Sequence, residues 1–271
     1  MKKDAGLEAR ISFGREAVLS QVGLFASNLG KVKSLWKADN SRVTKIDYAI
    51  SENLRQQIHV LFPLDHYCSE ESLDAEETIP LQNRFTWVVD PVDGTNNYAT
   101  GVVSCAISVG LFDGGEPAYG FLYDQSRSTL VEGGPGYGVL ENEKKVNPLP
   151  PEPFGEKATI GMHFPIPSNR VGQLHPLLAT AKLRSIGSGA LNLLHAAMGR
   201  TDGALDFKVR IWDIAAGLAL AKATNREYHF IGSSPLPLEE FSVNMPFSPY
   251  FCGTESFCEA IRGLLGLGKG G

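Results

Sequence analysis

An acidic stretch between two structural elements constrains this chain more than any other feature. Residues 87–97 read WVVDPVDGTNN, a short apolar run followed by two aspartates, a proline, a glycine and a threonine. This order is typical of a strand that passes into a helix. Asp90 and Asp93 offer hard oxygen ligands, which suit Mg²⁺, Mn²⁺ or Ca²⁺ better than Zn²⁺. Between them, Pro91 stiffens the backbone that carries the Val92 carbonyl.

The residues after these aspartates predict an anion site. Gly94 and Thr95 would begin a helix, whose first backbone amides are unpaired and lie at the positive end of the helix dipole. A metal site and a phosphate site would then lie side by side. The alternative is a plain turn, in which Thr95 caps the helix and both aspartates are solvated.

Two further acidic segments favour the metal site. Glu70 and Glu71 precede the aspartates in the segment CSEES, and Asp213 follows far downstream in WDIAAG. We expect these three segments to converge on one cluster of carboxylates. The alternative for the glutamate pair is a solvated acidic loop, because Asp74, Glu76 and Glu77 follow closely.

These segments resemble those of the inositol monophosphatase family, which belongs to the magnesium-dependent, lithium-sensitive sugar phosphatases. The resemblance is carried by SEES at 69–72, by WVVDPVDGTNNY at 87–98 and by WDIAAG at 212–217. It extends from Lys37 to the C-terminal helix and is weaker after residue 217. It implies an α/β fold of two lobes, built as an αβαβα layered sandwich. Four prolines between residues 147 and 154 suggest the boundary, with an α+β lobe at 1–150 and an α/β lobe at 151–271.

Cleavage of a phosphate ester requires an activated water, neutralised phosphoryl charge and a stabilised leaving group, and paired metal ions can supply all three. The resemblance implies that Glu70, Asp90 and the Val92 carbonyl hold a first metal ion. Asp90, Asp93 and Asp213 would hold a second, so that Asp90 bridges the two. The cofactor implied is Mg²⁺, two or three per site, with Mn²⁺ as a substitute.

The segment from Lys37 to Asp47, KADNSRVTKID, resembles another family element. The resemblance implies that Asp47 accepts a hydrogen bond from Thr95, whose hydroxyl then takes a proton from the attacking water. Glu71 would orient that water or Thr95, and Lys37 would anchor a loop that brings in a further metal ion. From the residues alone, Thr44 and Asp47 predict a helix capping box, and both roles are compatible.

Substrate contacts follow from the resemblance of RSIGSGA at 184–190 to a family loop, in which Gly189 replaces the usual alanine. Asp206 stands where many inositol phosphatases carry a glutamate that binds ring hydroxyls, and it is one methylene shorter. Lys208 and Arg210 are either an exposed basic pair or contacts to a second phosphate. The expected substrate-binding residues are Asp93, Gly94, Thr95, Gly187, Ser188, Gly189 and Asp206. The six histidines show no metal-binding spacing, so we interpret them, including His163, as surface or core residues.

Composition limits the class of protein. The chain has 271 residues, 43% of them hydrophobic, and a formal net charge of −5, which argues against a nucleic-acid binder. No apolar run is long enough for a membrane span and no signal sequence opens the chain, so we expect a cytoplasmic protein without a membrane partner. The four cysteines lack C-x-x-C spacing, which favours buried reduced thiols. By resemblance, the partners are a small phosphorylated substrate and a second copy in a homodimer.

Hydrophobic periodicity predicts alternating helices and strands. Helices are expected over 7–29, from Thr44 to Pro63, and over 189–198, 213–223 and 255–265. Strands are expected over 85–89, 105–112, 116–123, 129–132 and 158–162, with Gly114 and Gly115 in a hairpin turn.

The predicted function is hydrolysis of a small phosphomonoester by metal-activated water, with inositol monophosphate as the leading substrate class. Fructose 1,6-bisphosphate and 3′-phosphoadenosine phosphates remain alternatives, because the motifs define the metal cage and not the leaving group. A non-enzymatic, metal-stabilised partner-binding protein is a rival, although it would not need the Asp47–Thr95 pair. A two-metal nuclease is disfavoured by the lack of a basic groove.

Overall fold

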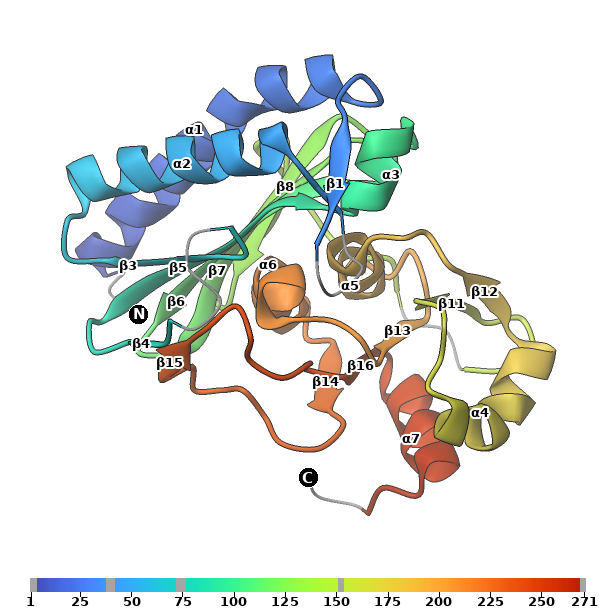
Figure 1. Ribbon diagram of the computed structural model, residues 1–271. Helices are drawn as coiled ribbons and strands as arrows, with labels where there is room; N and C mark the ends of the chain where they lie inside the picture. Colours follow the sequence, from blue (N-terminus) through green and yellow to red (C-terminus); the bar gives the residue numbers. More distant parts are fainter. Residues whose placement is uncertain (1–3, 38–41, 72–76, 151–153, 269–271) are drawn as a thin grey trace.

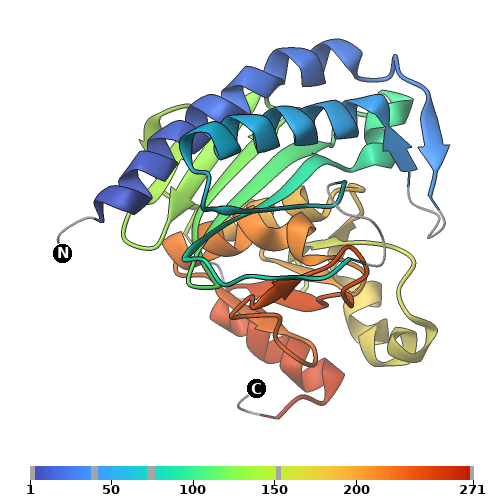
Figure 2. The ribbon, with the colours of Figure 1, turned by 60° about the vertical axis from the view of Figure 1, so that its left-hand side comes forward.

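The computed structural model describes residues 4–37, 42–71, 77–150 and 154–268, and the chain forms alternating layers of helices and sheets (Figure 1). Two helices cover the outer face of a large sheet, two lie between that sheet and a smaller one, and a further pair covers the far side. Figure 2 shows the same order of layers from a second direction. The αβαβα sandwich is therefore confirmed. The helices are α1 (Ala5–Asn28), α2 (Lys45–Leu61), α3 (Thr95–Thr100), α4 (Ser168–Thr180), α5 (Gly189–Ala197), α6 (Ile211–Ala223) and α7 (Glu255–Leu265).

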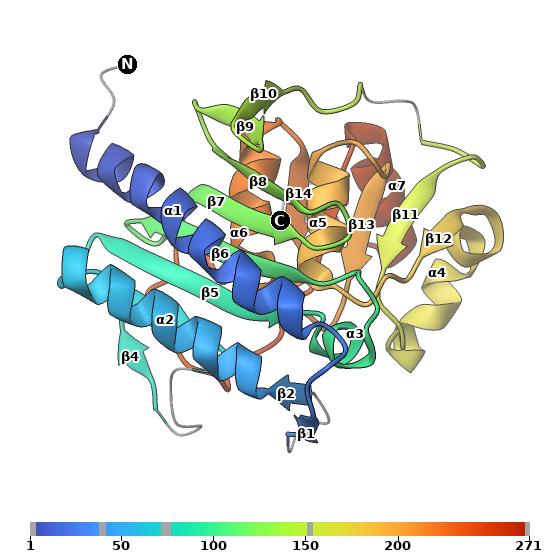
Figure 3. The same cartoon turned by 90° about the horizontal axis from the view of Figure 1, so that it is seen from above.

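Helices α1 and α2 lie side by side across the outer face of the large sheet (Figure 3). At the start of α1, the side chain of Asp4 accepts hydrogen bonds from the amides of Gly6 and Leu7. Helix α2 begins at the predicted capping box, in which Asp47 Oδ2 accepts from the amide of Thr44 at 2.9 Å. Its apolar positions are buried against the sheet, namely Ile46, Ile50, Leu54 and Ile58.

The large sheet has the strand order β10-β9-β8-β7-β6-β5-β3 and is antiparallel apart from the β3–β5 pair. The strand predicted over 85–89 is longer than expected, because pairing with its neighbour continues to Asp93 with a register shift after Asp90. Such irregularities re-aim side chains, so both aspartates come from the strand itself. The strands are β3 (His66–Ser69), β5 (Phe85–Asp93), β6 (Ala106–Asp113), β7 (Glu116–Asp124), β8 (Thr129–Gly134), β9 (Gly138–Glu141) and β10 (Lys144–Val146).

Helix α6 packs closely on the inner face of this sheet because small residues meet there. A Cβ atom added at Gly110 would lie 2.7 Å from the Ala215 side chain, and one at Gly120 would lie 2.3 Å from the Ala216 carbonyl oxygen. Only glycine allows this approach. The small residues of the WDIAAG segment therefore bring α6, and with it Asp213, down onto strands β5 to β7.

The smaller sheet has the order β12-β11-β13-β16-β14, with β11 parallel to both of its neighbours. Helix α4 beside it is not predicted from the sequence, because Pro176 lies inside it and proline ordinarily disrupts helices. Burial of Leu174 and Leu177 stabilises α4 in this place. The strands are β11 (Thr159–Met162), β12 (Lys182–Arg184), β13 (Gly203–Asp206), β14 (Glu227–Phe230) and β16 (Tyr250–Gly253), and two short pairs join β1 (Ser34–Trp36) to β2 (Arg42–Thr44) and β4 (Ile79–Pro80) to β15 (Glu240–Phe241).

The core between the two sheets contains side chains from both halves of the chain, since α5 and α6 pack there against β5 to β9 of the large sheet and against β11, β13, β14 and β16 of the smaller one. The division into lobes at residue 150 therefore stays a prediction. All four cysteines are buried and free, as predicted. Among the described residues, none of the helices has both the length and the apolar character needed to cross a bilayer. Residues 38–41 of the Lys37–Asp47 segment, residues 72–76 of the acidic loop and residues 151–153 of the proline-rich boundary lie outside the described residues.

Candidate active site

Three of the predicted acidic residues meet between the large sheet and α6. Asp90 and Asp93 come from the end of β5, and Asp213 from the first turn of α6. One carboxylate oxygen from each lies within 4.8 Å of the other two. Two segments more than a hundred positions apart in the sequence thus form one carboxylate triad, composed of Asp90, Asp93 and Asp213.

Asp93 of the carboxylate triad is also bonded to the predicted substrate loop. Its Oδ1 accepts from the amide of Gly189 at 3.1 Å and its Oδ2 from the amide of Ala190 at 3.2 Å. The hydroxyl of Ser188, the N-cap of α5, also donates to Asp93 Oδ2. The loop at 187–189 therefore reaches the site through Asp93, at the amino end of a helix that favours negative charge.

The other two members are held by backbone amides. Asp213 Oδ2 accepts from the amide of Arg210 at 2.7 Å, in the capping position of α6. Asp90 Oδ1 accepts from the amide of Val92 at 3.0 Å. Asp90 and Asp213 are thereby oriented by their own segments, whereas Asp93 is oriented by the start of α5.

Burial raises the pKa of all three carboxyls, and repulsion between the carboxylates adds to the shift for Asp90 and Asp213. Burial raises the pKa of Asp90 well above its usual range, and the charges of Glu70, Asp93 and Asp213 add to the shift. Burial and then Asp93 do the same to the pKa of Asp213. Burial raises the pKa of Asp93 to about 6, although its bond from Ser188 opposes the shift. A bound cation would relieve this repulsion.

This donor set fits Mg²⁺ or Mn²⁺. The ligand atoms are carboxylate oxygens from Asp90, Asp93 and Asp213, which hard cations prefer. The Val92 carbonyl accepts one hydrogen bond, from Thr95 at 2.9 Å, and a carbonyl oxygen retains a second lone pair for a cation. The predicted metal ligands on β5 and α6 are thus compatible with one hard-cation site.

Glu70 and Glu71 lie beside the triad and bind Lys37 instead of joining it. Lys37 Nζ lies 2.7 Å from Glu70 Oε1 and 2.5 Å from Glu71 Oε1. Burial lowers the pKa of Lys37, but the two carboxylates outweigh it and raise that pKa overall. Burial and the charge of Glu70 raise the pKa of Glu71 to about 7. The Lys37 ammonium group therefore balances the negative charge of the two glutamates.

Thr95 and Asp47 lie together as the family resemblance implies. Thr95 Oγ1 lies 3.3 Å from Asp47 Oδ1 and 2.9 Å from the Val92 carbonyl oxygen, and its single hydroxyl proton can be donated to either acceptor. The second oxygen of Asp47 accepts from the amide and hydroxyl of Thr44 at 2.9 and 2.6 Å. Burial raises the pKa of Asp47 to about 6. One carboxylate thus serves both the capping box and the contact with Thr95.

Gly94 lets the end of β5 turn tightly into α3. Its φ is +80°, and a Cβ atom there would lie 3.0 Å from the carbonyl oxygen of Gly187 and 3.1 Å from that of Ser104. Asn97 joins the same segments, since its Nδ2 donates to the carbonyls of Ser104 at 2.8 Å and Ile186 at 2.7 Å. The DGT turn and the 187–189 loop are therefore held against each other.

Asp206 is placed differently from a residue that binds substrate with its own carboxylate. It is 0% exposed, its Oδ1 accepts from the amide of His163 at 2.8 Å, and its Oδ2 accepts from Asn192 Nδ2 at 3.2 Å. The His163 ring lies against it, with Nδ1 3.5 Å from Oδ1, and is 25% exposed. Direct contact between Asp206 and substrate stays a prediction. Sequence spacing gives no signal for His163, which only the pairing of β11 with β13 brings here.

The basic pair at 208 and 210 is exposed only in part. Lys208 is exposed, whereas Arg210 is half-buried, with its guanidinium 4.2 Å from the centre of the Phe247 ring. Arg210 Nη1 also donates to the carbonyl of Met245. The Arg210 guanidinium is therefore already engaged by Met245 and Phe247.

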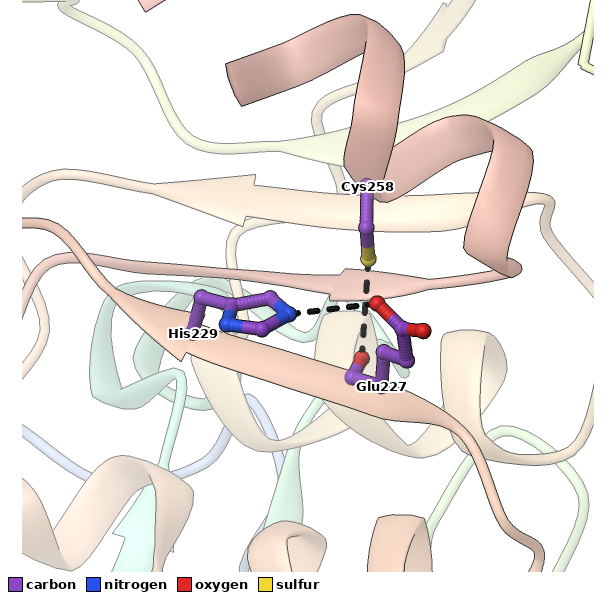
Figure 4. A group of neighbouring side chains, drawn as sticks. All are labelled: Glu227, His229 and Cys258. Atoms are coloured by element: carbon purple, nitrogen blue, oxygen red, sulfur yellow. Dashed lines mark hydrogen bonds and ion pairs between the residues drawn. The ribbon is translucent and has the colours of Figure 1, made fainter. Parts of the chain in front are cut away.

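A second group of metal-ligand types, Glu227, His229 and Cys258, lies between β14 and α7 (Figure 4). His229 Nε2 is 3.2 Å from Glu227 Oε2, but Arg262 Nη2 lies 2.5 Å from the same nitrogen and 3.6 Å from the same oxygen. Burial raises the pKa of Cys258 to about 12, which disfavours the thiolate a metal ion needs. The guanidinium already supplies positive charge, so this group ties α7 to β14.

Comparisons with known proteins place the chain in a family. Residues 11–243 match a model of the inositol monophosphatase family. A protein of Aquifex aeolicus named fructose-1,6-bisphosphatase/inositol-1-monophosphatase is 29% identical over 235 residues, covering 83% of this chain and 87% of that relative. An inositol-1-monophosphatase of Bacillus subtilis is 32% identical over 210 residues, covering 75% of this chain and 78% of that relative.

The fold is shared with solved structures. A structure described as IMPase/NADP phosphatase complexed with Mg²⁺ and phosphate superposes with a TM-score of 0.80 over 97% of both chains, at 21% identity. The family match takes in β5, α5 and α6, which carry the carboxylate triad and the loop bonded to it. A match of this extent, together with the layered fold, identifies the chain as a phosphatase of the inositol monophosphatase family.

Proposed function

We propose that this phosphatase is magnesium-dependent and hydrolyses a small polyol or sugar phosphate, with inositol monophosphate as the leading substrate class. The observation that carries the proposal is the carboxylate triad, whose oxygens lie within 4.8 Å of one another in a buried place. The names of both relatives include inositol-1-monophosphatase, and one structure of the same fold was solved with Mg²⁺ and phosphate. These names support the same substrate class and cofactor for this chain.

In this proposal, Glu70, Asp90 and the Val92 carbonyl hold one Mg²⁺, and Asp90, Asp93 and Asp213 hold a second. Asp90 would contribute to both sets, Mn²⁺ could substitute for Mg²⁺, and Lys37 would anchor a loop that brings in a third ion. When bound, such ions lower the pKa of a coordinated water and neutralise the charge of a phosphoryl group. Glu70 reaches its ligand position once Lys37 no longer holds it, since the ammonium and a metal ion compete for the same carboxylate.

The remaining residues orient the reacting groups. Asp47 accepts a hydrogen bond from the Thr95 hydroxyl when that hydroxyl turns away from the Val92 carbonyl, so a lone pair of Thr95 Oγ1 faces the attacking water and can accept its proton. Glu71 orients that water, and the amides of Gly94 and Thr95 bind phosphate oxygens at the start of α3. The proposed substrate contacts are Asp93, Gly94, Thr95, Gly187, Ser188 and Gly189, while the predicted residue Asp206 is buried and would act through its neighbours.

The Asp47–Thr95 contact argues against a purely partner-binding role. A protein that used its metal ions only for stability would not need a hydroxyl held 3.3 Å from a carboxylate beside them. Fructose 1,6-bisphosphate remains a second candidate substrate, because the Aquifex aeolicus relative is named for both activities. Nucleotide 3′-phosphates remain a third, since the metal ligands do not select the leaving group.

A substrate panel tests the proposal. Phosphate release is measured with myo-inositol 1-phosphate, fructose 1,6-bisphosphate and 3′-phosphoadenosine 5′-phosphate, each with Mg²⁺ and with EDTA. We expect turnover only with Mg²⁺ and fastest with the inositol ester. Absence of release from every ester in Mg²⁺ would refute the proposed function, and a preference for another ester would refute the substrate class alone.

The family resemblance also leads us to propose a homodimer that Li⁺ inhibits. Light scattering after gel filtration measures the mass of the assembly, and a chain mass of 29.3 kDa sets the value for a monomer. A lithium titration of the phosphate-release assay measures inhibition. A monomer, or full activity at high lithium concentration, would contradict the corresponding expectation.

A further inference from the structure

His163 and Asp206 form one corner of the site, where strands β11 and β13 end. These neighbouring strands are parallel, and their register pairs Met162 with Leu205. The next residues, His163 and Asp206, therefore reach the carboxyl ends of the two strands together. In open α/β sheets this is the edge at which ligands bind.

Helix α5 connects this corner to the carboxylate triad. Its first amides, from Gly189 and Ala190, donate to Asp93. Asn192, on the same helix, donates to Asp206 Oδ2 at 3.2 Å. The corner and the triad are thus neighbours on one rigid element.

The His163 ring is held by Asp206 at one edge. Asp206 Oδ1 accepts from the main-chain amide of His163 at 2.8 Å and lies 3.5 Å from ring Nδ1. Ring Nε2 makes no hydrogen bond to the described residues, and the side chain is 25% exposed. Asp206 itself is 0% exposed. The group that this corner presents to solvent is therefore the imidazole and not the carboxylate.

We propose that His163 is a specificity-determining residue whose Nε2 hydrogen-bonds a hydroxyl of the substrate's polyol, with Asp206 as its positioning residue. This inference rests on the proposed function and names His163 as the residue that recognises the polyol of the substrate. An aspartate at 206 is one methylene shorter than glutamate and is fully enclosed, so the ring of His163 makes the contact in its place. The substrates selected are phosphate esters of vicinal polyols, whose hydroxyls lie next to the ester.

The test compares two esters that share the phosphate group but differ in hydroxyls. The variants are H163A and, as a matched control, H175A, because His175 is an exposed histidine on α4 outside the site. For myo-inositol 1-phosphate we expect H163A to raise KM about three- to tenfold, which is the loss of one hydrogen bond, with little change in kcat. For p-nitrophenyl phosphate, which lacks polyol hydroxyls, we expect a smaller loss than for the inositol ester. H175A should match the wild type on both esters.

Two further variants separate a specific contact from general damage. H163Q retains a side-chain donor and should recover part of the loss in KM. D206N should shift the ratio of kcat/KM between the two esters in the same direction as H163A, and the double variant should add little to H163A alone. If thermal unfolding shows that H163A folds poorly, the kcat/KM ratio between the two esters is measured with H163Q and D206N instead.

The outcomes distinguish this inference from the function on which it rests. Failure of the wild-type protein to hydrolyse either ester would refute the proposed function and this inference with it. Normal wild-type turnover combined with an unchanged ratio in the His163 variants would overturn this inference alone. An equal loss on both esters would likewise overturn it, since the effect would not depend on the polyol.

Discussion

Replacement of Asp213 by asparagine should make the metal-free protein more stable while it weakens metal binding. The introduced amide oxygen can still accept from the amide of Arg210, which now bonds to Asp213 at 2.7 Å. The amide nitrogen would point into the triad, where Asp90 can accept a hydrogen bond from it. The substitution thus preserves the helix start and removes one buried negative charge.

The size of the effect follows from the spacing of the charges. Carboxylate oxygens of the triad lie within 4.8 Å of one another, and two unit charges at that upper limit repel by about 3.5 kcal/mol at an effective dielectric constant near 20. The metal-free triad avoids part of this cost by retaining a proton, so we expect D213N to raise the free energy of unfolding by about 1 to 2 kcal/mol. For a chain of this size, that corresponds to a rise in Tm of about 2 to 8 °C.

Thermal unfolding in EDTA and in Mg²⁺ measures both consequences. Mg²⁺ at a hundred times its Kd should stabilise the wild type by about 2.7 kcal/mol, and a tenfold weaker site reduces that gain to about 1.4 kcal/mol. E240Q is a suitable control, because Glu240 is an exposed carboxylate on β15 and its loss should alter neither value. A lower Tm for D213N in EDTA, or an undiminished gain from Mg²⁺, would refute the triad as the metal site.

Three further predictions address other parts of the site. Burial raises the pKa of Asp93 and Asp47 to about 6, so the folded state holds protons more tightly than the unfolded state between pH 4 and pH 6. These groups therefore stabilise the metal-free protein in acid, and their contribution is lost as the pH rises through about 6. The gain in Tm from Mg²⁺ should accordingly be smaller at pH 5 than at pH 8, and an equal gain would contradict this assignment. K37M leaves the charges of Glu70 and Glu71 uncompensated. Thermal unfolding of K37M should give a lower Tm in EDTA and a larger rise in Tm on addition of Mg²⁺ than in the wild type. A smaller rise than in the wild type would show that Lys37 assists Mg²⁺ binding. T95V should lower kcat at least a hundredfold and leave the rise in Tm from Mg²⁺ unchanged, because only the hydroxyl is lost. T95S keeps the hydroxyl and should retain most activity. Full activity in T95V would exclude Thr95 as the proton acceptor.

The sequence predicts most of what brings the triad together. The aspartates at 90 and 93 and the WDIAAG segment are local motifs, and the small residues that let α6 approach the sheet lie in the same segment as Asp213. The capping box at Thr44 is equally local, since its two partners are three residues apart. The geometry of such motifs is set by neighbouring residues in the sequence, so they can be recognised before the tertiary structure is known.

Features set by tertiary contacts could not be read in the same way. Pro91 argues for an early end to β5, but the register shift accommodates it within the strand. Helix α4 contains Pro176 and depends on two buried leucines for its place. His163 and Asp206 are 43 residues apart and become neighbours only through parallel pairing of their strands. No spacing rule in a single sequence reports such a pair.

Diffraction from crystals soaked in Mn²⁺ tests the central claim most directly, because the anomalous signal locates the ion without reference to activity. We predict a peak bounded by the carboxylates of Asp90, Asp93 and Asp213. Anomalous peaks elsewhere, with these three side chains bound to no ion at saturating Mn²⁺, would contradict the assignment of the site.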